Sequence, residues 1–376
     1  MSAVPPLYNM GGSSIHAASN PRVLWSGLDT LECWYPGGVR GYWREHLEWA
    51  KQRARKRDVP EPVLSGGTRW GVDRKGLKPW AYLLRSPDLH LRVGTGKAGF
   101  SVRCLSLGLA ARGADALLAE AERSMLVMGE FSESRVSRVD LAVDFQGHVP
   151  GLEEMTQAVC PASFRPVYPS IAAPETYQFG RGAIVARVYN KTAEVARGGS
   201  HWPGVWRESG RWDENAGDVW RVEFQYRSDA LRDFGIRTID DLRGAVDSLW
   251  RKGFEWLSVR GDLSDSNKQR RSVAPWWASL ADGYAHADPL ERCRDEHAYT
   301  HATAYVPQAS GLLVSIAAHL GIHDPAEAMR WLLRAMGEYH CDKLTDFEAL
   351  VIERQLELFG VSTSDGLEPV YAHIVL

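Results

Sequence analysis

The chain has 376 residues, 44% of them hydrophobic, and carries a formal net charge of −3. This length and apolar content are sufficient for a buried core in two or more units. No apolar run reaches the length of a membrane span, so no membrane association is predicted. The charge balance argues against a protein that coats nucleic acid through its overall charge.

The start of the chain and its cysteines bear on where such a protein works. Residues 1–20 lack the basic start and apolar stretch of a secretory signal, so we predict a disordered lead-in. The cysteines are scattered without the close pairing of a structural zinc site, which favours a reducing, cytoplasmic setting. The five are Cys33, Cys104, Cys160, Cys293 and Cys341.

Hydrophobic periodicity predicts strands and helices in two successive groups. In chain order the expected elements are a strand within 23–34, a helix over 41–57, extended segments around 80–86, 89–95 and 100–109, a helix over 113–129, a strand over 137–145, a helix near 151–160, extended segments within 175–190, a Gly- and Trp-rich loop over 198–217, a strand over 219–227 and a helix near 238–256. This order predicts an α+β fold with antiparallel sheets in a main domain, 21–288, and leaves open two related halves, 21–135 and 136–288. Beyond it, residues 289–376 are expected to form a helical tail domain, with helical segments at 311–321, 325–340 and 345–360.

Three of the expected strands carry charged groups on alternate positions. Because successive side chains of a strand point to opposite faces, the residues of each set share one face. The three sets are Arg138, Asp140, Ala142 and Asp144; Arg187, Tyr189 and Lys191; and Arg221, Glu223, Gln225 and Arg227. An antiparallel sheet with one solvated face gives the same alternation, so a plain surface explains the pattern as well.

The acidic members of these faces point to a divalent cation. Asp and Glu are poor strand formers, and bringing them together raises their mutual repulsion unless a cation is bound. Hard cations such as Mg²⁺ or Mn²⁺ take carboxylate oxygens. We therefore predict that Asp140, Asp144 and Glu223 bind one Mg²⁺ or Mn²⁺.

The tyrosine between two cations is a candidate nucleophile. A tyrosine hydroxyl has a pKa of about 10, and neighbouring cations such as Arg187 and Lys191 favour the phenolate. A metal ion could polarise a phosphodiester that Tyr189 attacks, which would give a covalent phosphotyrosine. The alternative is that Tyr189 is a structural tyrosine of an edge strand.

The motifs occur in an order that is typical of one family. The four blocks are "RVDLAVD" (138–144), "ETYQFGRGAIVARVYNKTAE" (175–194), "WRVEFQYR" (220–227) and "DSNKQRRSVAPWW" (265–277). Together they resemble the replication initiation factors of rolling-circle plasmids (the Rep_trans type) and the related relaxases of integrative conjugative elements. The resemblance covers roughly residues 20–280 and leaves the helical tail without a counterpart.

The resemblance implies an antiparallel sheet with helices packed on one side and metal-dependent nicking of one DNA strand at an origin. The enzyme would attach to the 5′-phosphate through tyrosine and leave a free 3′-hydroxyl. Many rolling-circle nucleases bind metal through a His–hydrophobic–His pair, which this chain lacks, so acids would take that role. The implied partner is origin DNA, single-stranded or in a cruciform, and a host helicase and a homodimer stay open. Tyr177 is a second candidate nucleophile, although it lacks cations at both flanking alternate positions.

Several side chains are candidates for contacts to DNA or to the catalytic groups. Those expected to contact DNA phosphates are Arg138, Arg221, Asn267, Lys268, Arg270 and Arg271. For Arg138 and Arg221, pairing with the nearby acids is an equal alternative. Trp276 and Trp277 either stack on unpaired bases or fill a core. Glu194 positions Lys191, joins the metal shell or is a plain surface glutamate.

Two other functions fit the same residues, and a third changes the nucleophile. A conjugative relaxase would use the same chemistry, and a sequence-specific DNA-binding protein without nuclease activity would suit the modest charge. Against the pure binder, carboxylates facing DNA phosphates have no use in binding alone. A metal-dependent nuclease that uses water in place of tyrosine is the third alternative.

Overall fold

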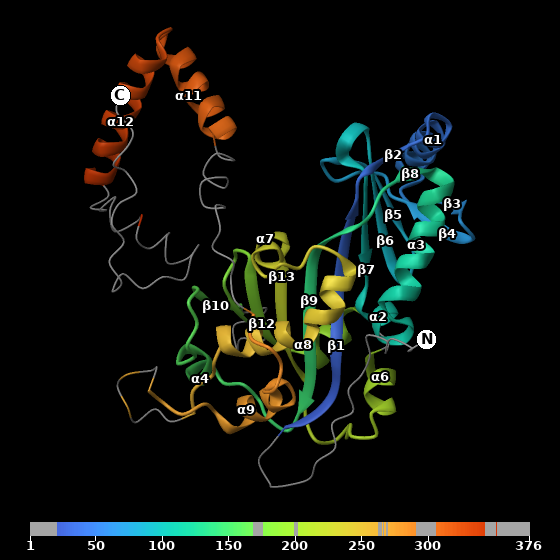
Figure 1. Ribbon diagram of the computed structural model, residues 1–376, viewed down its shortest axis with the longest axis vertical. Helices are drawn as coiled ribbons and strands as arrows, with labels where there is room; N and C mark the ends of the chain where they lie inside the picture. The colour runs from blue at the N-terminus through green and yellow to red at the C-terminus, as the bar shows by residue number, and fades with distance from the viewer. Residues whose placement is uncertain are drawn as a thin grey trace. The chain divides into compact units, whose positions relative to one another are not determined.

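The computed structural model describes residues 21–167, 176–198, 202–261, 265, 267, 270–290, 306–342 and 351. The chain divides into two compact units, Met1–Arg292 and Cys293–Leu376 (Figure 1). The predicted lead-in, residues 1–20, lies outside the described residues.

The first unit is built on one large antiparallel sheet, where the sequence predicted several. Its strand order is β10-β11-β12-β13-β9-β1-β7-β6-β5-β4-β3. The strands are β1 (Arg22–Tyr35), β3 (Glu61–Ser65), β4 (Thr68–Val72), β5 (Trp80–Arg85), β6 (Leu89–Gly94), β7 (Phe100–Cys104), β9 (Arg135–Gln146), β10 (Phe164–Val167), β11 (Thr176–Phe179), β12 (Ile184–Asn190) and β13 (Trp220–Arg227). A separate small pair is formed by β2 (Gly37–Val39) and β8 (Gly129–Phe131). The predicted α+β class with antiparallel pairing is confirmed.

The two halves of the sheet are built in the same way, outward from the two central strands β1 and β9. From β1 the neighbours are β7, β6, β5, β4 and β3, and from β9 they are β13, β12, β11 and β10. In each half the last strand of a meander returns to pair with the long strand that opens that half. β1 and β9 also pair with each other, which joins both halves into one sheet.

One face of this sheet is apolar and carries the main core. Alternate side chains such as Leu91, Leu141 and Phe224 lie in a single buried cluster that spans both halves. The longer helices of both halves and α9 contribute buried residues to this cluster, and each fully buried Leu or Phe contributes about 1.5–3 kcal/mol to stability. They are α1 (Gly41–Arg57), α3 (Ala114–Met128), α8 (Ile239–Trp256) and α9 (Pro275–Ala281).

The opposite face of the sheet is polar. A smaller apolar cluster covers one end of it. There α6 (Trp202–Glu208) packs Trp202 and Trp206 against Trp25 of β1. The sequence predicted a loop over 198–217, so α6 was missed. Shorter helices complete the unit: α2 (Ser106–Arg112), α4 (Leu152–Thr156), α5 (Lys191–Gly198) and α7 (Ser228–Asp233).

The second unit is described as two helices, α11 (Val306–Leu320) and α12 (Pro325–Asp342). They cover two of the helical segments predicted for the tail, while the third, 345–360, lies almost wholly outside the described residues. No helix within the described ranges is long and apolar enough to cross a bilayer.

The fit of α8 against β13 gives a direct test of the core. A Cβ added at Gly253 would lie 2.6 Å from the Phe224 ring and 2.8 Å from the Tyr226 hydroxyl. Gly253→Ala should therefore lower the free energy of unfolding by about 1–3 kcal/mol, because the helix must move off the sheet.

The matched control lies on the same helix. A Cβ at Gly244 meets nothing within 4 Å, so Gly244→Ala should raise the free energy of unfolding by about 0.5–1 kcal/mol. Denaturant titrations of both variants measure the difference, and equal effects would contradict the close helix–sheet packing.

Candidate active site

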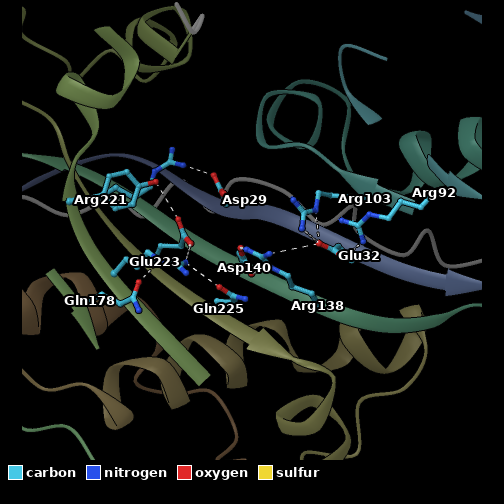
Figure 2. Close-up of polar contacts among 12 residues, drawn as sticks. Asp29, Glu32, Arg92, Arg103, Arg138, Asp140, Gln178, Arg221, Glu223 and Gln225 are labelled. Carbon is cyan, nitrogen blue, oxygen red and sulfur yellow. Dashed lines mark hydrogen bonds and ion pairs between the residues drawn. The ribbon is translucent and has the colours of Figure 1, made fainter. Parts of the chain in front are cut away.

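The strand register brings the predicted side chains onto the polar face of the sheet. β12, β13 and β9 are neighbours, and Arg187 lies opposite Glu223 across β12 and β13. Across β13 and β9, Arg221 lies opposite Asp144 and Gln225 opposite Asp140. Because directly opposed residues of an antiparallel pair share a face, the members of each pair point the same way. Figure 2 labels Arg221, Glu223, Gln225 and Asp140 on this face.

Glu223 accepts hydrogen bonds from both of its neighbours on β12. The half-buried Tyr189 hydroxyl donates to Glu223 Oε2 over 3.2 Å. Arg187 Nη1 donates to Glu223 Oε1 over 2.7 Å and also reaches Gln225 Oε1 at 3.1 Å. The phenol is therefore already in contact with a carboxylate that could accept its proton.

The electrostatic setting of Tyr189 differs from the predicted one. Burial raises the pKa of the Tyr189 phenol well above its usual value; the Arg221 charge opposes this, and the Glu223 and Asp29 charges add to it. The predicted effect of Arg187 and Lys191 in favour of the phenolate is opposed by burial, and Arg187 is paired with Glu223. The phenol is protonated and needs a base.

Glu223 has the property that such a base requires. Burial raises the pKa of Glu223, the nearby Asp29 charge adds to this, and the Arg187 and Arg221 guanidinium groups oppose it. A carboxylate with a raised pKa holds a transferred proton more readily than an ordinary one.

Lys191 lies beside Tyr189 for a different reason than strand alternation. β12 ends at Asn190, whose side-chain oxygen accepts from the Ala193 amide over 2.8 Å and so caps α5. Lys191 opens that helix, is 4% exposed, and holds its ammonium 5.7 Å from the centre of the Tyr189 ring. Its partner is Glu194, one of the predicted arrangements.

Arg221 is a structural cation rather than a DNA contact. Its guanidinium is fully buried, pairs with Asp144 at 2.8 Å and also pairs with Asp29. The guanidinium lies 4.2 Å from the Trp202 ring centre. The prediction that Arg221 reaches DNA phosphates is therefore wrong, and the alternative, pairing with the acids, holds.

Asp140 is paired with Arg138 and has a raised pKa. Both of its oxygens accept from Arg138, whose side chain is 25% exposed. Burial raises the pKa of Asp140 to about 7; Arg138 opposes this, and the Glu223 and Asp29 charges add to it. The charges of Asp29 and Glu223 therefore both act on Asp140, and Asp29 is the acid that sequence reasoning missed, because it lies at a bulge of β1.

The predicted metal ligands do not fit a shared ion as they are placed. Asp140 accepts hydrogen bonds from Arg138, and Asp144 accepts them from Arg221 and Trp206. Glu223 accepts them from Arg187 and Tyr189. Within the described part of the chain, no three His, Cys, Asp or Glu side chains are grouped so that they could hold a metal ion. Each carboxylate oxygen already has a protein donor, so we derive no step through a metal.

Tyr177, the other candidate nucleophile, lies on the apolar face. It pairs with Val188 across β11 and β12, is 2% exposed, and donates its hydroxyl to the Pro150 carbonyl over 3.0 Å. A phosphodiester cannot reach this hydroxyl without unfolding the core. The strand register therefore puts Tyr177 on the apolar face and Tyr189 on the polar face, a distinction that the sequence alone left open.

The predicted DNA-contacting segment near the C-terminal end of the main unit is only partly described. Arg270 is exposed and ion-paired with Asp265, while Arg271 donates to Gln157 Oε1 over 2.7 Å. Asn267 is exposed, and Lys268 lies outside the described residues. Trp276 and Trp277 are 4% and 1% exposed, so of the two alternatives the structure favours core filling over stacking on bases.

Comparisons with known proteins give limited help. No protein-family model matches the chain, and no curated protein sequence does. A similar solved structure is described as the rolling circle replication initiator protein from Geobacillus stearothermophilus, with 13% identity and a TM-score of 0.41. The similarity covers 73% of this chain and 98% of that one. A likeness at this level does not establish a shared family, so the functional argument rests on this chain's own residues.

The raised pKa of Asp140 makes stability depend on pH. Between pH 4 and 7, bounded by its ordinary pKa of 3.8 and its folded pKa of about 7, the folded state binds a proton that the unfolded state has released. The free energy of unfolding should therefore fall as pH rises through this range, since the folded state must give up that proton.

Asp140→Asn should flatten this decline, which denaturant titrations at several pH values measure. The control is Asp229→Asn, a substitution at an exposed aspartate paired with Arg232, which should leave the shape of the curve unchanged. An unaltered decline in Asp140→Asn would show that another group carries it.

Proposed function

We propose that the chain is a rolling-circle replication initiator that nicks one strand of origin DNA through a covalent 5′-phosphotyrosine. The contact between the Tyr189 hydroxyl and the Glu223 carboxylate, with Arg187 on the second oxygen, carries this proposal. The three side chains lie on one sheet face, where they could serve as nucleophile, base and cation. The order of the sequence motifs supports the same assignment.

Glu223 acts as the general base in the proposed reaction. It takes the phenolic proton as the Tyr189 oxygen forms a bond to phosphorus. The bond from phosphorus to the 3′-oxygen breaks, and that oxygen takes a proton from solvent while Glu223 later returns its own proton to solvent. The phosphodiester energy is kept in the phosphotyrosine, so a 3′-hydroxyl can reverse the step and rejoin the strand.

Proton transfer also changes what Arg187 can do. While Glu223 is charged, it holds the Arg187 guanidinium at 2.7 Å. Once Glu223 is protonated, that attraction weakens, and the partly exposed guanidinium, which keeps its contact to Gln225, can also bind the nonbridging oxygens on which charge builds. Lys191 adds a second positive charge beside the Tyr189 ring.

The predicted Mg²⁺ or Mn²⁺ stays a prediction without a role in these steps. For Asp140 or Glu223 to bind an ion, Arg138 or Arg187 would have to release it. Conjugative relaxases use the same tyrosine chemistry, and the genes next to this one would separate replication from transfer. A binding protein without nuclease activity would form no adduct in the experiment below.

Tyr189→Phe should abolish the covalent adduct, because phenylalanine has no oxygen to form the bond to phosphorus. The assay incubates the protein with labelled single-stranded fragments tiled across its own replicon, with Mn²⁺ and with EDTA, and separates denaturant-stable adducts on a gel. DNA binding should stay within a few-fold of wild type. The control is Tyr177→Phe, which should retain the adduct, since that hydroxyl is buried against Pro150. An adduct that survives Tyr189→Phe would move the nucleophile elsewhere.

Glu223→Gln should slow adduct formation by about 10²–10⁴-fold, the usual contribution of a general base. Glutamine keeps an oxygen for Arg187 and the shape of the side chain, but it cannot take the proton. Single-turnover rates measure this effect. Gln178→Ala serves as the control, because Gln178 reaches Arg187 only over 3.4 Å and does not contact the phenol. A wild-type rate in Glu223→Gln would contradict the role of Glu223.

A further inference from the structure

A second charged cluster lies on the same polar face, in the first half of the sheet. Glu32 of β1 accepts from Arg92 of β6 over 3.0 Å and pairs with Arg103 of β7. Arg138 of β9, the partner of Asp140, lies 3.8 Å from the same carboxylate. Figure 2 shows this cluster beside the one around Glu223, along β1 and β9. One carboxylate therefore faces three guanidinium groups.

The field at this cluster is positive. Burial raises the pKa of Glu32, but the Arg103 and Arg92 charges and their hydrogen bonds outweigh it, so the pKa is lowered overall. The neighbouring His90 has its pKa lowered to about 4 by burial and by the Arg85, Arg103 and Arg92 charges. Because three guanidinium groups surround one carboxylate, an anion brought to this surface is attracted.

Aromatic rings stand among these cations. The Arg92 guanidinium lies 5.3 Å from the centre of the Trp80 ring, and the exposed Arg135 lies 5.9 Å from the centre of the Trp34 ring. Both rings are half-buried, so each has part of its surface open to solvent. Cations interleaved with partly open aromatic rings are the pattern by which proteins hold single-stranded nucleic acid, through phosphate contacts and base stacking.

The position of this cluster in the fold matches that of the active site. Outward from β9, the active-site groups lie on β13 and β12; outward from β1, the second cluster lies on β7 and β6. Arg138 touches both clusters, because it pairs with Asp140 and lies near Glu32. Arg138 therefore links the two clusters on one polar face of the sheet.

We propose that this arginine surface, made of Trp34, Trp80, Arg92, Arg103 and Arg135, binds the single strand of DNA that leads to or from Tyr189. Five strand spacings of about 4.8 Å separate β12 from β6, so the path is roughly 24 Å long and holds several nucleotides. Arg103 and Arg135 bind phosphates, and the tryptophan rings stack on bases. The identity of the strand rests on the proposed function, whereas binding to the surface itself does not.

The test measures how affinity grows with strand length. Tyr189→Phe protein is titrated with fluorescent oligothymidylates of about 6 and about 30 nucleotides, lengths that bracket known single-strand sites. Adding Arg103→Gln and Arg135→Gln should weaken binding of the long strand on the order of tenfold. The slope of log affinity against log salt should fall by about 1.4 for two lost phosphate contacts. Binding of the short strand should change much less.

Two further variants keep the proposal open to refutation. Glu32→Gln removes the one carboxylate of the cluster, so it should tighten binding of the long strand. Arg123→Gln removes an exposed arginine from α3, on the apolar side of the sheet, and should change nothing. Thermal melts establish that each variant is folded. If the double variant binds the long strand as wild type does, or if Glu32→Gln weakens binding, the arginine surface is a structural ion cluster only.

The outcomes for this surface and for the proposed function are distinguishable. Loss of the length effect in the double variant, together with no adduct from any protein that keeps Tyr189, would overturn the proposed function but not the surface. Adduct formation together with wild-type binding by the double variant would overturn the surface alone.

Discussion

The arrangement of the site depends on one buried ion cluster, that of Arg221. Its guanidinium has no contact with solvent and is held by Asp144 from β9 and Asp29 from β1. Removing one partner of such a cluster typically costs 3–5 kcal/mol, because a charge is left buried without compensation. The cluster therefore fixes β13 against the two central strands. Tyr189 lies directly opposite Arg221, and Glu223 lies two residues along β13, so the cluster also fixes the positions of these two residues.

The buried charges of the polar face are compensated by oppositely charged side chains rather than by solvent. The charges of Asp29 and Glu223 raise the pKa of neighbouring acidic groups, while Arg138, Arg187 and Arg221 oppose this effect. A single proton that moves from Tyr189 to Glu223 disturbs this balance locally and weakens the hold on Arg187. Chemistry at the phenol and release of a cation toward phosphate are thus linked by the same carboxylate.

Much of this arrangement follows from local sequence patterns. Period-two alternation over 137–145 and 219–227 correctly placed β9 and β13, since one face of each strand is apolar and packs on the core. Helical spacing predicted α1 with its observed ends, and α3 and α8 to within a residue or two at each end. The shared face of Arg187 and Tyr189 also followed, because alternate side chains of one strand point the same way.

The remainder depended on contacts between distant segments. Burial of Arg221 requires α6, which lies in a stretch whose glycines and tryptophans predicted a loop. The pairing of each acid with its own arginine depends on register and on the β1 bulge near Asp29. Nothing in the residues around Tyr177 shows that register turns it toward the core. The basic character of the first half was missed because Arg92 and Arg103 are isolated in sequence and meet only across strands.

The seam between β1 and β9 has a consequence for the integrity of the molecule. β1 is 14 residues long and β9 is 12, and they pair along most of their length. A fragment that ended at residue 135 would lack β9. The edge of β1 that pairs with β9 would then be exposed and could pair with strands of other chains. Neither half is therefore suited to independent existence, and the two should melt as a single cooperative block.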